Sequence, residues 1–498
     1  MKRDNTAWGP TPAASLQWRE GAEPFSTAFK DIYYSRENGL AESRHVFLAG
    51  NDLPARWQDQ GQDTHFCIAE TGFGTGLNFL QTWQAWRERR GTSRRLHYIA
   101  IEKHPLDRQQ LTRALQAWPE LADLATQLLE AWPGRLPGQH RLSLDAGCVV
   151  LDLWWEDASA ALNDLASHGQ CVDAWYLDGF APARNESMWL PEIFDCMAAM
   201  SRPGATVATF TAASFVRRGL QNAGFDMRKV PGFGRKRESL VGKIATLRSH
   251  LSARVTPWDL SASPRERPES ALIIGAGLAG ATLARALAER GLAVAVLDKG
   301  DIAGAASGNE QGVLYTRLSR RHSALTDFAL QSFRYSATFY RQLLGTGELE
   351  EPFGGQLCGS FHQHSDVEEL QLMRERLQAL PELASVLGTE EAARYLGVTP
   401  AQPGYWYPDS GWLSPPAVCR ALLTTPCIEV IERCGELSLH HHSGQWLARN
   451  AGGSDVLAAD VAIVCAGTSS TGLAGLDWLP LQAIRGQTSH LPASPASS

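Results

Sequence analysis

Acidic residues and glycines alternate in one short stretch early in the chain. Glu70 is followed by Gly72, Gly74 and Gly76. This Glu-x-Gly-x-Gly-x-Gly spacing suits S-adenosylmethionine, because glycine lets the backbone take a positive φ and approach a ligand closely. A second acid, Glu102, ends the next apolar run and can accept hydrogen bonds from both ribose hydroxyls. We therefore expect these five residues to bind S-adenosyl-L-methionine.

A second glycine loop, with a different spacing, lies in the other half of the chain. Gly275, Gly277 and Gly280 form Gly-x-Gly-x-x-Gly, and Asp298 lies 23 residues after Gly275. This distance suits a carboxylate that binds ribose, while the helix after the loop offers its N-terminus to a pyrophosphate. The pattern predicts a dinucleotide site, and FAD is the cofactor that we expect there.

A loop of small residues follows this second motif. It contains Ser307 and Asn309, which can lie against a flavin pyrophosphate. An ordinary surface loop is the alternative interpretation, because small polar residues are common in both settings.

Two further acids follow apolar, strand-like runs in the first half. Asp178 comes directly after residues 171–177, and ligands of open α/β sheets bind beyond the carboxyl ends of the strands. It is therefore the candidate catalytic residue, able to orient an amine or accept its proton. A turn or helix-cap role is the alternative. Asp157 can contact an adenine amino group, and a solvated loop acid is equally consistent with its position.

Three consecutive cations, Arg235, Lys236 and Arg237, follow the glycine-flanked Phe233. A loop of this composition can bind phosphates and stack on a base, so these residues are the candidate contacts to RNA. A solvated charged face is the alternative interpretation.

Two βαβ units are expected to position these residues. The first has strands at 66–69 and 96–101 and a helix that carries Phe79, Trp83 and Trp86 on one stripe. The second has strands at 271–274 and 292–297, with Gly291 as the C-cap of its helix. Residues 251–269 are rich in Pro, Ser and charge, which predicts a linker between domains 1–250 and 270–498.

The bulk composition excludes several classes of protein. The chain has 498 residues and a net charge of -7, which argues against wholesale coating of nucleic acid. Its nine cysteines form no Cys-x-x-Cys pair, and the adjacent histidines 440–442 would point to opposite faces of an extended segment, so we expect no metal site. No apolar run is long enough to span a bilayer, and the N-terminus does not look like a signal peptide. We expect a cytoplasmic protein without membrane contact.

Several motifs of the first half resemble one family closely. These motifs are at 70–79 (ETGFGTGLNF), 178–183 (DGFAPA), 214–220 (SFVRRGL) and 233–238 (FGRKRE). They resemble the methyltransferase half of MnmC, a family of bifunctional bacterial tRNA-modifying enzymes, and the similarity runs from about residue 25 to 245. In the second half the glycine loop and residues 306–309, 411–416 and 484–487 are similar to the amine-oxidase half of that family, of the glycine and D-amino-acid oxidase type.

The resemblance implies a fold and a reaction sequence. The fold would be a class I, Rossmann-like methyltransferase domain followed by an FAD-binding Rossmann domain. The FAD half would oxidise the side chain of 5-carboxymethylaminomethyluridine in tRNA to leave an aminomethyl group, which the first half would methylate with S-adenosylmethionine at Asp178. Arg485 is the candidate for binding the substrate carboxylate. A methyltransferase with a non-catalytic flavin domain, and a small-amine enzyme pair that does not act on RNA, are the alternatives.

The resemblance in the second half stops at Gln487, whereas the flavin half of that family continues further. It therefore implies a truncated, incomplete FAD domain, with weak flavin binding and low oxidase activity.

Overall fold

The computed structural model describes residues 6–19, 23–34, 39–59, 65–89, 95–167, 169–234, 236–247 and 268–487. Most of the expected linker at 251–269, Arg235, and residues 488–498 lie outside these ranges, so the domain boundary stays a prediction. Contacts divide the chain into two compact units. The first comprises residues 1–262, 316–338 and 361–407, and the second comprises 263–315, 339–360 and 408–498.

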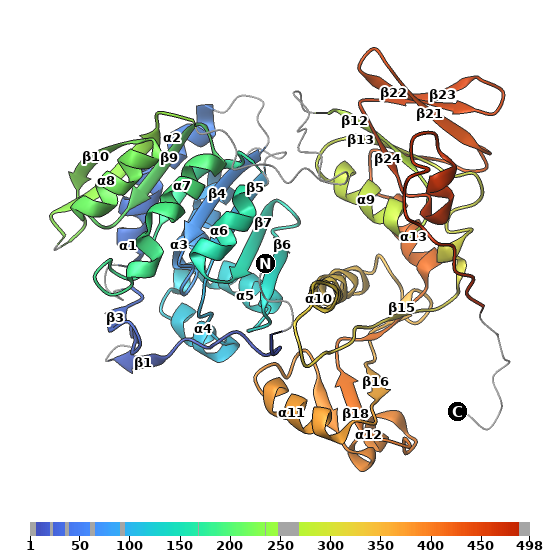
Figure 1. The fold of residues 1–498 in the computed structure, drawn as a ribbon, viewed down its shortest axis with the longest axis horizontal. Coiled ribbons are helices and arrows are strands. Elements are labelled where there is room, and N and C mark those ends of the chain that lie inside the picture. Colours follow the sequence, from blue (N-terminus) through green and yellow to red (C-terminus); the bar gives the residue numbers. More distant parts are fainter. Residues whose placement is uncertain are drawn as a thin grey trace. The chain divides into compact units, whose positions relative to one another are not determined.

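An eight-stranded sheet forms the centre of the first unit (Figure 1). Its central strand, β4 (His65–Thr71), contains the apolar run at 66–69 and pairs in parallel with β5 (Arg95–Ile101) and β8 (Val172–Leu177). The order is β10-β11-β9-β8-β4-β5-β7-β6. The other strands are β6 (Gly138–Leu144), β7 (Val149–Trp155), β9 (Ser201–Thr209), β10 (Phe225–Pro231) and β11 (Glu238–Ile244).

Helices cover both faces of this sheet. Alternate residues of β4 enter two separate cores, because successive side chains of a strand point to opposite faces. Phe66 and Ile68 pack with α3 and α5, whereas Cys67 and Ala69 pack with α6 and α7. The helices are α1 (Gly39–Ser43), α2 (Leu53–Asp59), α3 (Leu77–Arg89), α4 (Arg108–Leu115), α5 (Ala122–Ala131), α6 (Ala158–Ala166), α7 (Pro191–Met200) and α8 (Ser214–Ala223).

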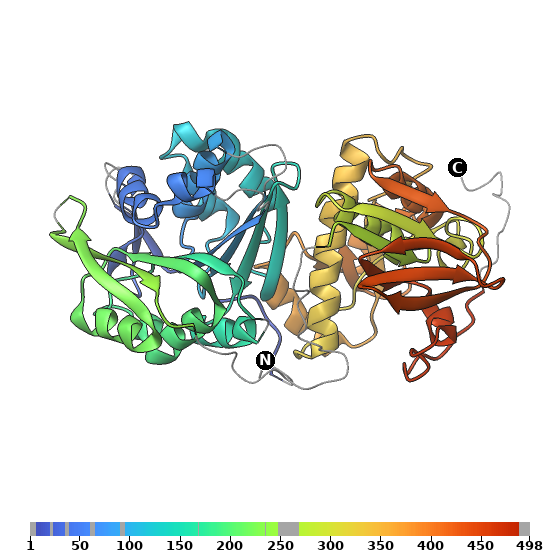
Figure 2. The same cartoon turned by 90° about the horizontal axis from the view of Figure 1, so that it is seen from above.

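The second unit contains a four-stranded parallel sheet, in the order β20-β13-β12-β24. Its strands are β12 (Ser270–Ile274), β13 (Ala293–Leu297), β20 (Ile428–Ile431) and β24 (Val461–Val464). Ala271 and Ile273 of β12 pack under α9 (Leu278–Ala288) and α13 (Pro415–Leu423). Leu272 and Ile274 pack against the antiparallel sheet β21 (Leu437–His442), β22 (Gln445–Asn450) and β23 (Asp455–Ala459), drawn in red in Figure 2.

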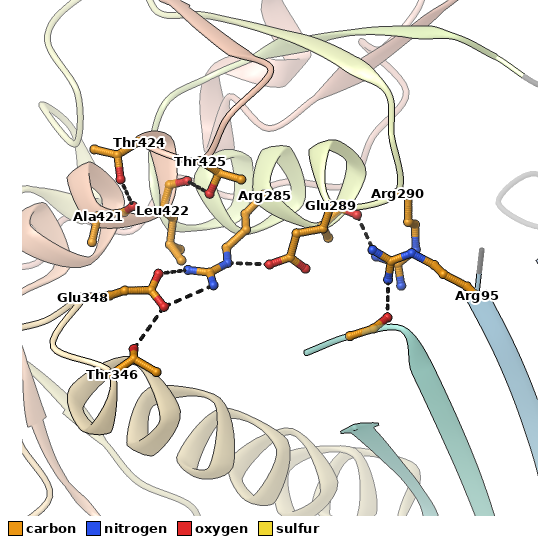
Figure 3. A network of polar contacts seen from close by, with 12 residues as sticks. Arg95, Arg285, Glu289, Arg290, Thr346, Glu348, Ala421, Leu422, Thr424 and Thr425 are labelled. Atoms are coloured by element: carbon orange, nitrogen blue, oxygen red, sulfur yellow. Dashed lines mark hydrogen bonds and ion pairs between the residues drawn. The ribbon is translucent and has the colours of Figure 1, made fainter. Parts of the chain in front are cut away.

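Helix α9 follows the second glycine loop, and Gly291 closes it, as the sequence predicts. The helix ends at Ala288. Gly291 has φ +86°, its N–H donates to the Ala288 oxygen at 2.8 Å, and the N–H of Leu292 donates to the Leu287 oxygen at 3.2 Å, which is the pattern of a glycine-capped helix end. Arg285 of α9 pairs with Glu289 (2.8 Å) and with Glu348 (Figure 3).

Further helices and strands are described in both parts of the chain. A small sheet before the glycine loop of the first unit consists of β1 (Leu16–Arg19), β2 (Glu23–Ser26) and β3 (Asp31–Ile32). The remaining elements are α10 (Ala324–Gly345), α11 (Val367–Leu377), α12 (Thr389–Leu396), β14 (Gly312–Leu314), β15 (Gly355–Gln356), β16 (Ser360–Gln363), β17 (Ser385–Leu387), β18 (Gly404–Tyr407) and β19 (Gly411–Leu413). Among the helices described, none combines the length and apolarity needed to cross a membrane.

Candidate active sites

A cavity of about 420 Å³ opens in the first unit beyond the carboxyl ends of β4, β5, β7 and β8. This is the edge at which open α/β sheets bind ligands. Six of the residues singled out from the sequence line it together, although they come from distant parts of the chain: Gly72, Gly74, Glu102, Asp157, Asp178 and Lys236.

The glycine loop packs directly on the turn that carries Asp178. Gly72 has φ +76°, and a Cβ atom there would lie 2.8 Å from the Cα of Gly179. Thr71 Oγ1 donates to the backbone oxygen of Asp178 at 2.9 Å. Gly76 has φ +72°, and a Cβ atom there would meet the ring of Phe73 at 2.7 Å. The loop therefore requires glycine both for its backbone angles and for its close approach to the neighbouring turn.

Glu102 faces this loop from the end of β5. Its Oε2 accepts from the backbone N–H of Gly74 at 3.0 Å, and its Oε1 accepts from the N–H of His104 at 2.8 Å. These two bonds fix the carboxylate, and each oxygen keeps a further lone pair. The arrangement fits the expected contact with ribose hydroxyls.

Glu70 lies at the end of β4, buried behind the cavity. Its Oε1 accepts from Asn78 Nδ2 at 2.7 Å and its Oε2 accepts from the hydroxyl of Tyr98 at 2.9 Å. Burial, and next the charge of Asp178, raise the pKa of Glu70 well above its usual range. Glu70 does not line the cavity, and its expected contact with S-adenosylmethionine stays a prediction.

Asp178 is the acid whose environment best suits proton transfer. It is half-buried at the cavity wall, and its Oδ2 accepts from Asn78 Nδ2 at 2.7 Å. Burial raises its pKa from 3.8 to about 6, against opposing effects of the Gly179 N–H, Asn78 and Lys236. At neutral pH the carboxylate is ionised, yet it is more basic than an ordinary aspartate, as a general base near neutrality requires.

Asp157 caps a helix, a role that was not predicted for it from the sequence. It lines the cavity, and it is also the N-cap of α6, where its Oδ1 accepts from the Ser159 N–H at 3.1 Å. Its Oδ2 pairs with Lys103 at 3.1 Å. The adenine contact stays a prediction.

An aromatic wall of the cavity was not predicted from the sequence. Phe29 stacks on Phe180 with ring centroids 4.7 Å apart, and Tyr33 meets Phe180 edge-on at 5.1 Å. Asp31 accepts from the backbone N–H of Ala181 at 3.2 Å, which joins the N-terminal segment to the turn after Asp178. The aromatic cluster at 29–34 was the available signal, but no glycine motif or periodicity marks it.

The basic loop divides between the cavity and the surface. Lys236 Nζ pairs with Glu42 at 2.8 Å and lies 4.4 Å from the ring centroid of Phe210, and all three residues line the cavity. Arg237 is exposed. The ammonium group of Lys236 is therefore already partly engaged by Glu42 and Phe210. The expected phosphate contacts of Arg235, Lys236 and Arg237 stay a prediction.

The acid of the second site is held in the same way as Glu102. Asp298 Oδ2 accepts from the backbone N–H of Ala276 in the glycine loop at 2.7 Å, and Oδ1 accepts from the N–H of Gly300 at 2.8 Å. The carboxylate therefore stands beside the loop at the end of β13, where a ribose of a dinucleotide is expected.

The second glycine loop leaves a cradle for a pyrophosphate. Gly275 has φ +111°, and a Cβ atom at Gly280 would lie 1.9 Å from the Gly275 oxygen, so strand and helix approach closely. A Cβ atom at Gly277 would lie 2.9 Å from Ser307 Oγ, which accepts from the Leu278 N–H at the start of α9. Glycine, helix N-terminus and hydroxyl together fit FAD.

The other two residues expected at the flavin site have no described partner that tests their roles. Asn309 is exposed just after this Ser307 turn, and Arg485 is exposed near the end of the described chain. Their parts in cofactor and carboxylate binding stay predictions. Within the described ranges, no cluster of three or more His, Cys, Asp or Glu side chains is placed to hold a metal ion.

Comparison with protein families assigns a class to each half. A family described as S-adenosyl-L-methionine-dependent methyltransferase matches residues 119–245, and one described as FAD dependent oxidoreductase matches residues 270–498. The chain is thus a bifunctional enzyme with an α/β methyltransferase domain and an FAD-binding oxidoreductase domain, and S-adenosyl-L-methionine and FAD are its cofactors.

Whole-chain relatives define the family. The chain is 43% identical to the tRNA 5-methylaminomethyl-2-thiouridine biosynthesis bifunctional protein MnmC of Stutzerimonas stutzeri (strain A1501), over 99% of this chain and 73% of that protein. Its identity to the protein of the same name from Ectopseudomonas mendocina (strain ymp) is 41%, over 97% and 72%. The chain belongs to the MnmC family, which confirms the resemblance. A crystal structure of MnmC2 from Aquifex aeolicus covers 49% of this chain and 74% of its own, with 18% identity and a TM-score of 0.38.

Proposed function

We propose that this enzyme completes a modified wobble uridine of tRNA in two consecutive steps. The FAD half removes the carboxymethyl group of 5-carboxymethylaminomethyl(-2-thio)uridine, and the methyltransferase half converts the resulting 5-aminomethyl group to 5-methylaminomethyl. The names of the relatives support this substrate. When bound, FAD accepts a hydride and S-adenosylmethionine supplies a methyl group. The proposed domains are 1–250 and 270–498, joined by a linker at 251–269, and a tRNA substrate favours a cytoplasmic location.

The position of Asp178 carries the methyl-transfer half of the proposal. The aminomethyl nitrogen of the substrate must lose a proton before its lone pair can attack a methyl group. Asp178 lies at the cavity wall beside Gly72, and burial makes its carboxylate more basic than usual. It can hold the ammonium group in the ionised state, accept one proton from it and leave the nitrogen facing the cofactor site.

In the oxidation step, the residues of the second site bind the cofactor and the substrate. Hydride leaves the CH₂ group beside the substrate carboxylate, water adds to the imine, and glyoxylate departs to leave a primary amine. Gly277, Ser307 and Asp298 would orient the cofactor, and Arg485 is proposed to bind the carboxylate that is removed.

Mass spectrometry of tRNA nucleosides tests the proposal directly. Bacterial cells lacking their own enzyme of this family should accumulate the 5-carboxymethylaminomethyl nucleoside, and expression of this chain should convert it to 5-methylaminomethyl. Accumulation of 5-aminomethyl would show that only the first step occurs, and an unchanged nucleoside pattern would contradict the proposal.

A further inference from the structure

One side chain joins the buried acid of the glycine loop to the candidate base. Asn78, the second residue of α3, donates from Nδ2 to Glu70 Oε1 and to Asp178 Oδ2, each at 2.7 Å. A primary amide nitrogen carries two hydrogens, so each acid receives one. Both donor positions of this amide are therefore used by carboxylates: Glu70 lies on β4, and Asp178 directly follows the adjacent strand β8.

The oxygen of the amide has a hydrogen-bond partner as well. Ser43 Oγ donates to Asn78 Oδ1 at 2.6 Å, and Ser43 belongs to α1. If the amide were flipped, its oxygen would face the two carboxylates and its NH₂ group would face the hydroxyl. Both hydrogen bonds to the acids would then be lost. The backbone oxygen of Asn78 also accepts from Thr82 Oγ1 at 2.7 Å, one turn further along α3.

We propose that Asn78 is a positioning residue for methyl transfer: it anchors one carboxylate oxygen of Asp178, so that the rest of the carboxylate faces the acceptor amine. This inference rests on the proposed function of the methyltransferase half. Asn78 acts through Asp178, and it is distinct from the glycines and acids that the motif itself marks as cofactor ligands.

Anchoring matters because a general base must be held close to its productive geometry. Without this bond the carboxylate keeps the Gly179 N–H but loses the donor that holds Oδ2, and a misplacement of about 1 Å can reduce turnover by roughly a hundredfold. The bond also stabilises the ionised form of Asp178, and so limits the rise in pKa that burial causes.

The test measures turnover of the full-length chain with tRNA that carries 5-aminomethyluridine. Asn78→Leu should lower kcat by roughly 10- to 100-fold, while the KM for S-adenosylmethionine changes by less than about 5-fold. In the wild type, log kcat should fall more steeply below a pH of about 6, where Asp178 takes up a proton. In Asn78→Leu this break should move to higher pH, because the bond that favours the ionised carboxylate is lost.

Two further variants keep the inference testable if Asn78→Leu does not fold. Asn78→Asp preserves the shape of the side chain and can still accept from Ser43, but it places a third acid against Glu70 and Asp178. It should lose at least as much kcat as the leucine variant. Gln81→Leu is the matched control on α3, because the Gln81 amide is buried without a hydrogen-bond partner and does not line the cavity. It should keep wild-type turnover.

Each result separates this inference from the proposed function. An inactive wild-type enzyme would count against the function itself. An active wild type, together with Asn78 variants that keep both kcat and the position of the pH break, would overturn the positioning role. So would a variant that changes only the KM for S-adenosylmethionine, because Asn78 would then act through Glu70 alone.

Discussion

At the scale of single residues, the first site contains three acids, and each is held by its own set of hydrogen-bond donors. Glu102 receives backbone N–H groups, Glu70 receives Tyr98 and Asn78, and Asp178 receives Asn78. Asp178 is the member that both lines the cavity and has its pKa raised to about 6 by burial. Its ionised form is therefore held at a cost in stability, which active sites commonly bear.

Because of this cost, we expect the difference in stability between Asp178→Asn and the wild type to depend on pH. The pKa of Asp178 is raised from 3.8 to about 6, so the folded protein binds more protons than the unfolded chain between these values. Wild-type stability contributed by this group is present at low pH and is lost as the pH rises through that window. The neutral amide avoids the loss, so Asp178→Asn should raise Tm at pH 7 to 8 by roughly 1–3 °C, with a smaller gain near pH 4.

Calorimetric melts at both pH values check this prediction, and Asp226→Asn on an exposed position of β10 is the control. A lower Tm of Asp178→Asn at pH 8 would contradict it, because Asp178 would then be a stabilising turn residue.

The sequence predicted Glu70, Glu102 and Asp178 because each directly follows, or ends, an apolar strand, and strand ends are local features. It did not predict Asn78. An asparagine between Leu77 and Phe79 reads as an ordinary helix position. Its role arises from contacts with a residue 100 positions away, which no local pattern encodes.

At the scale of elements, the strand–loop–helix junction of β4 and α3 is the feature on which the first site depends. Gly72→Ala should weaken S-adenosylmethionine binding at least tenfold, because the new Cβ would lie 2.8 Å from the Gly179 Cα and φ is +76°. Gly204→Ala is the matched control: its φ is +84°, but its Cβ would meet only Lys243, at 3.7 Å. Isothermal calorimetry should show normal affinity in the control, and equal loss in both variants would argue against the loop as the binding element.

The equivalent junction of β12 and α9 predicts an effect on flavin. Gly277→Val would fill the space beside Ser307 at the start of α9, where the pyrophosphate is expected, and should lower the bound flavin per protein several-fold. Gly291→Ala, where no heavy atom lies within 4 Å of the added Cβ, should retain it. Flavin absorbance of the purified proteins checks this, and full flavin content in Gly277→Val would place the cofactor elsewhere.

The two βαβ junctions could be predicted from the sequence because glycine spacing, apolar runs and helix periodicity all act over a few residues. The aromatic wall could not. Asp31 and Ala181 are joined across 150 positions, and Phe29 stacks on Phe180 only because the N-terminal segment folds back over the sheet edge. The glycine that closes α9 could be predicted as well, because Gly291 lies within three residues of the helix end and takes the positive φ that only glycine adopts readily.

At the scale of the whole molecule, the enzyme must bind a large polyanion although its net charge is -7. Local basic residues must therefore supply the contacts. Arg237→Gln should reduce the slope of log Kd for tRNA against log salt by about one unit. Lys236→Gln should change the slope less, because Lys236 is already paired with Glu42 and lies over Phe210. Unchanged slopes in both variants would make this loop a solvated charged face.

We propose that this chain methylates the wobble uridine of tRNA and that Asp178 is the base in this step. One measurement tests both parts most directly. Purified full-length enzyme is given methyl-labelled S-adenosylmethionine and tRNA that carries 5-aminomethyluridine, and the nucleosides are then analysed by mass spectrometry. We predict label in 5-methylaminomethyluridine with the wild type, and turnover reduced by roughly a hundredfold or more in Asp178→Asn. Label transferred to free small amines but not to tRNA, or equal turnover in Asp178→Asn, would contradict the account.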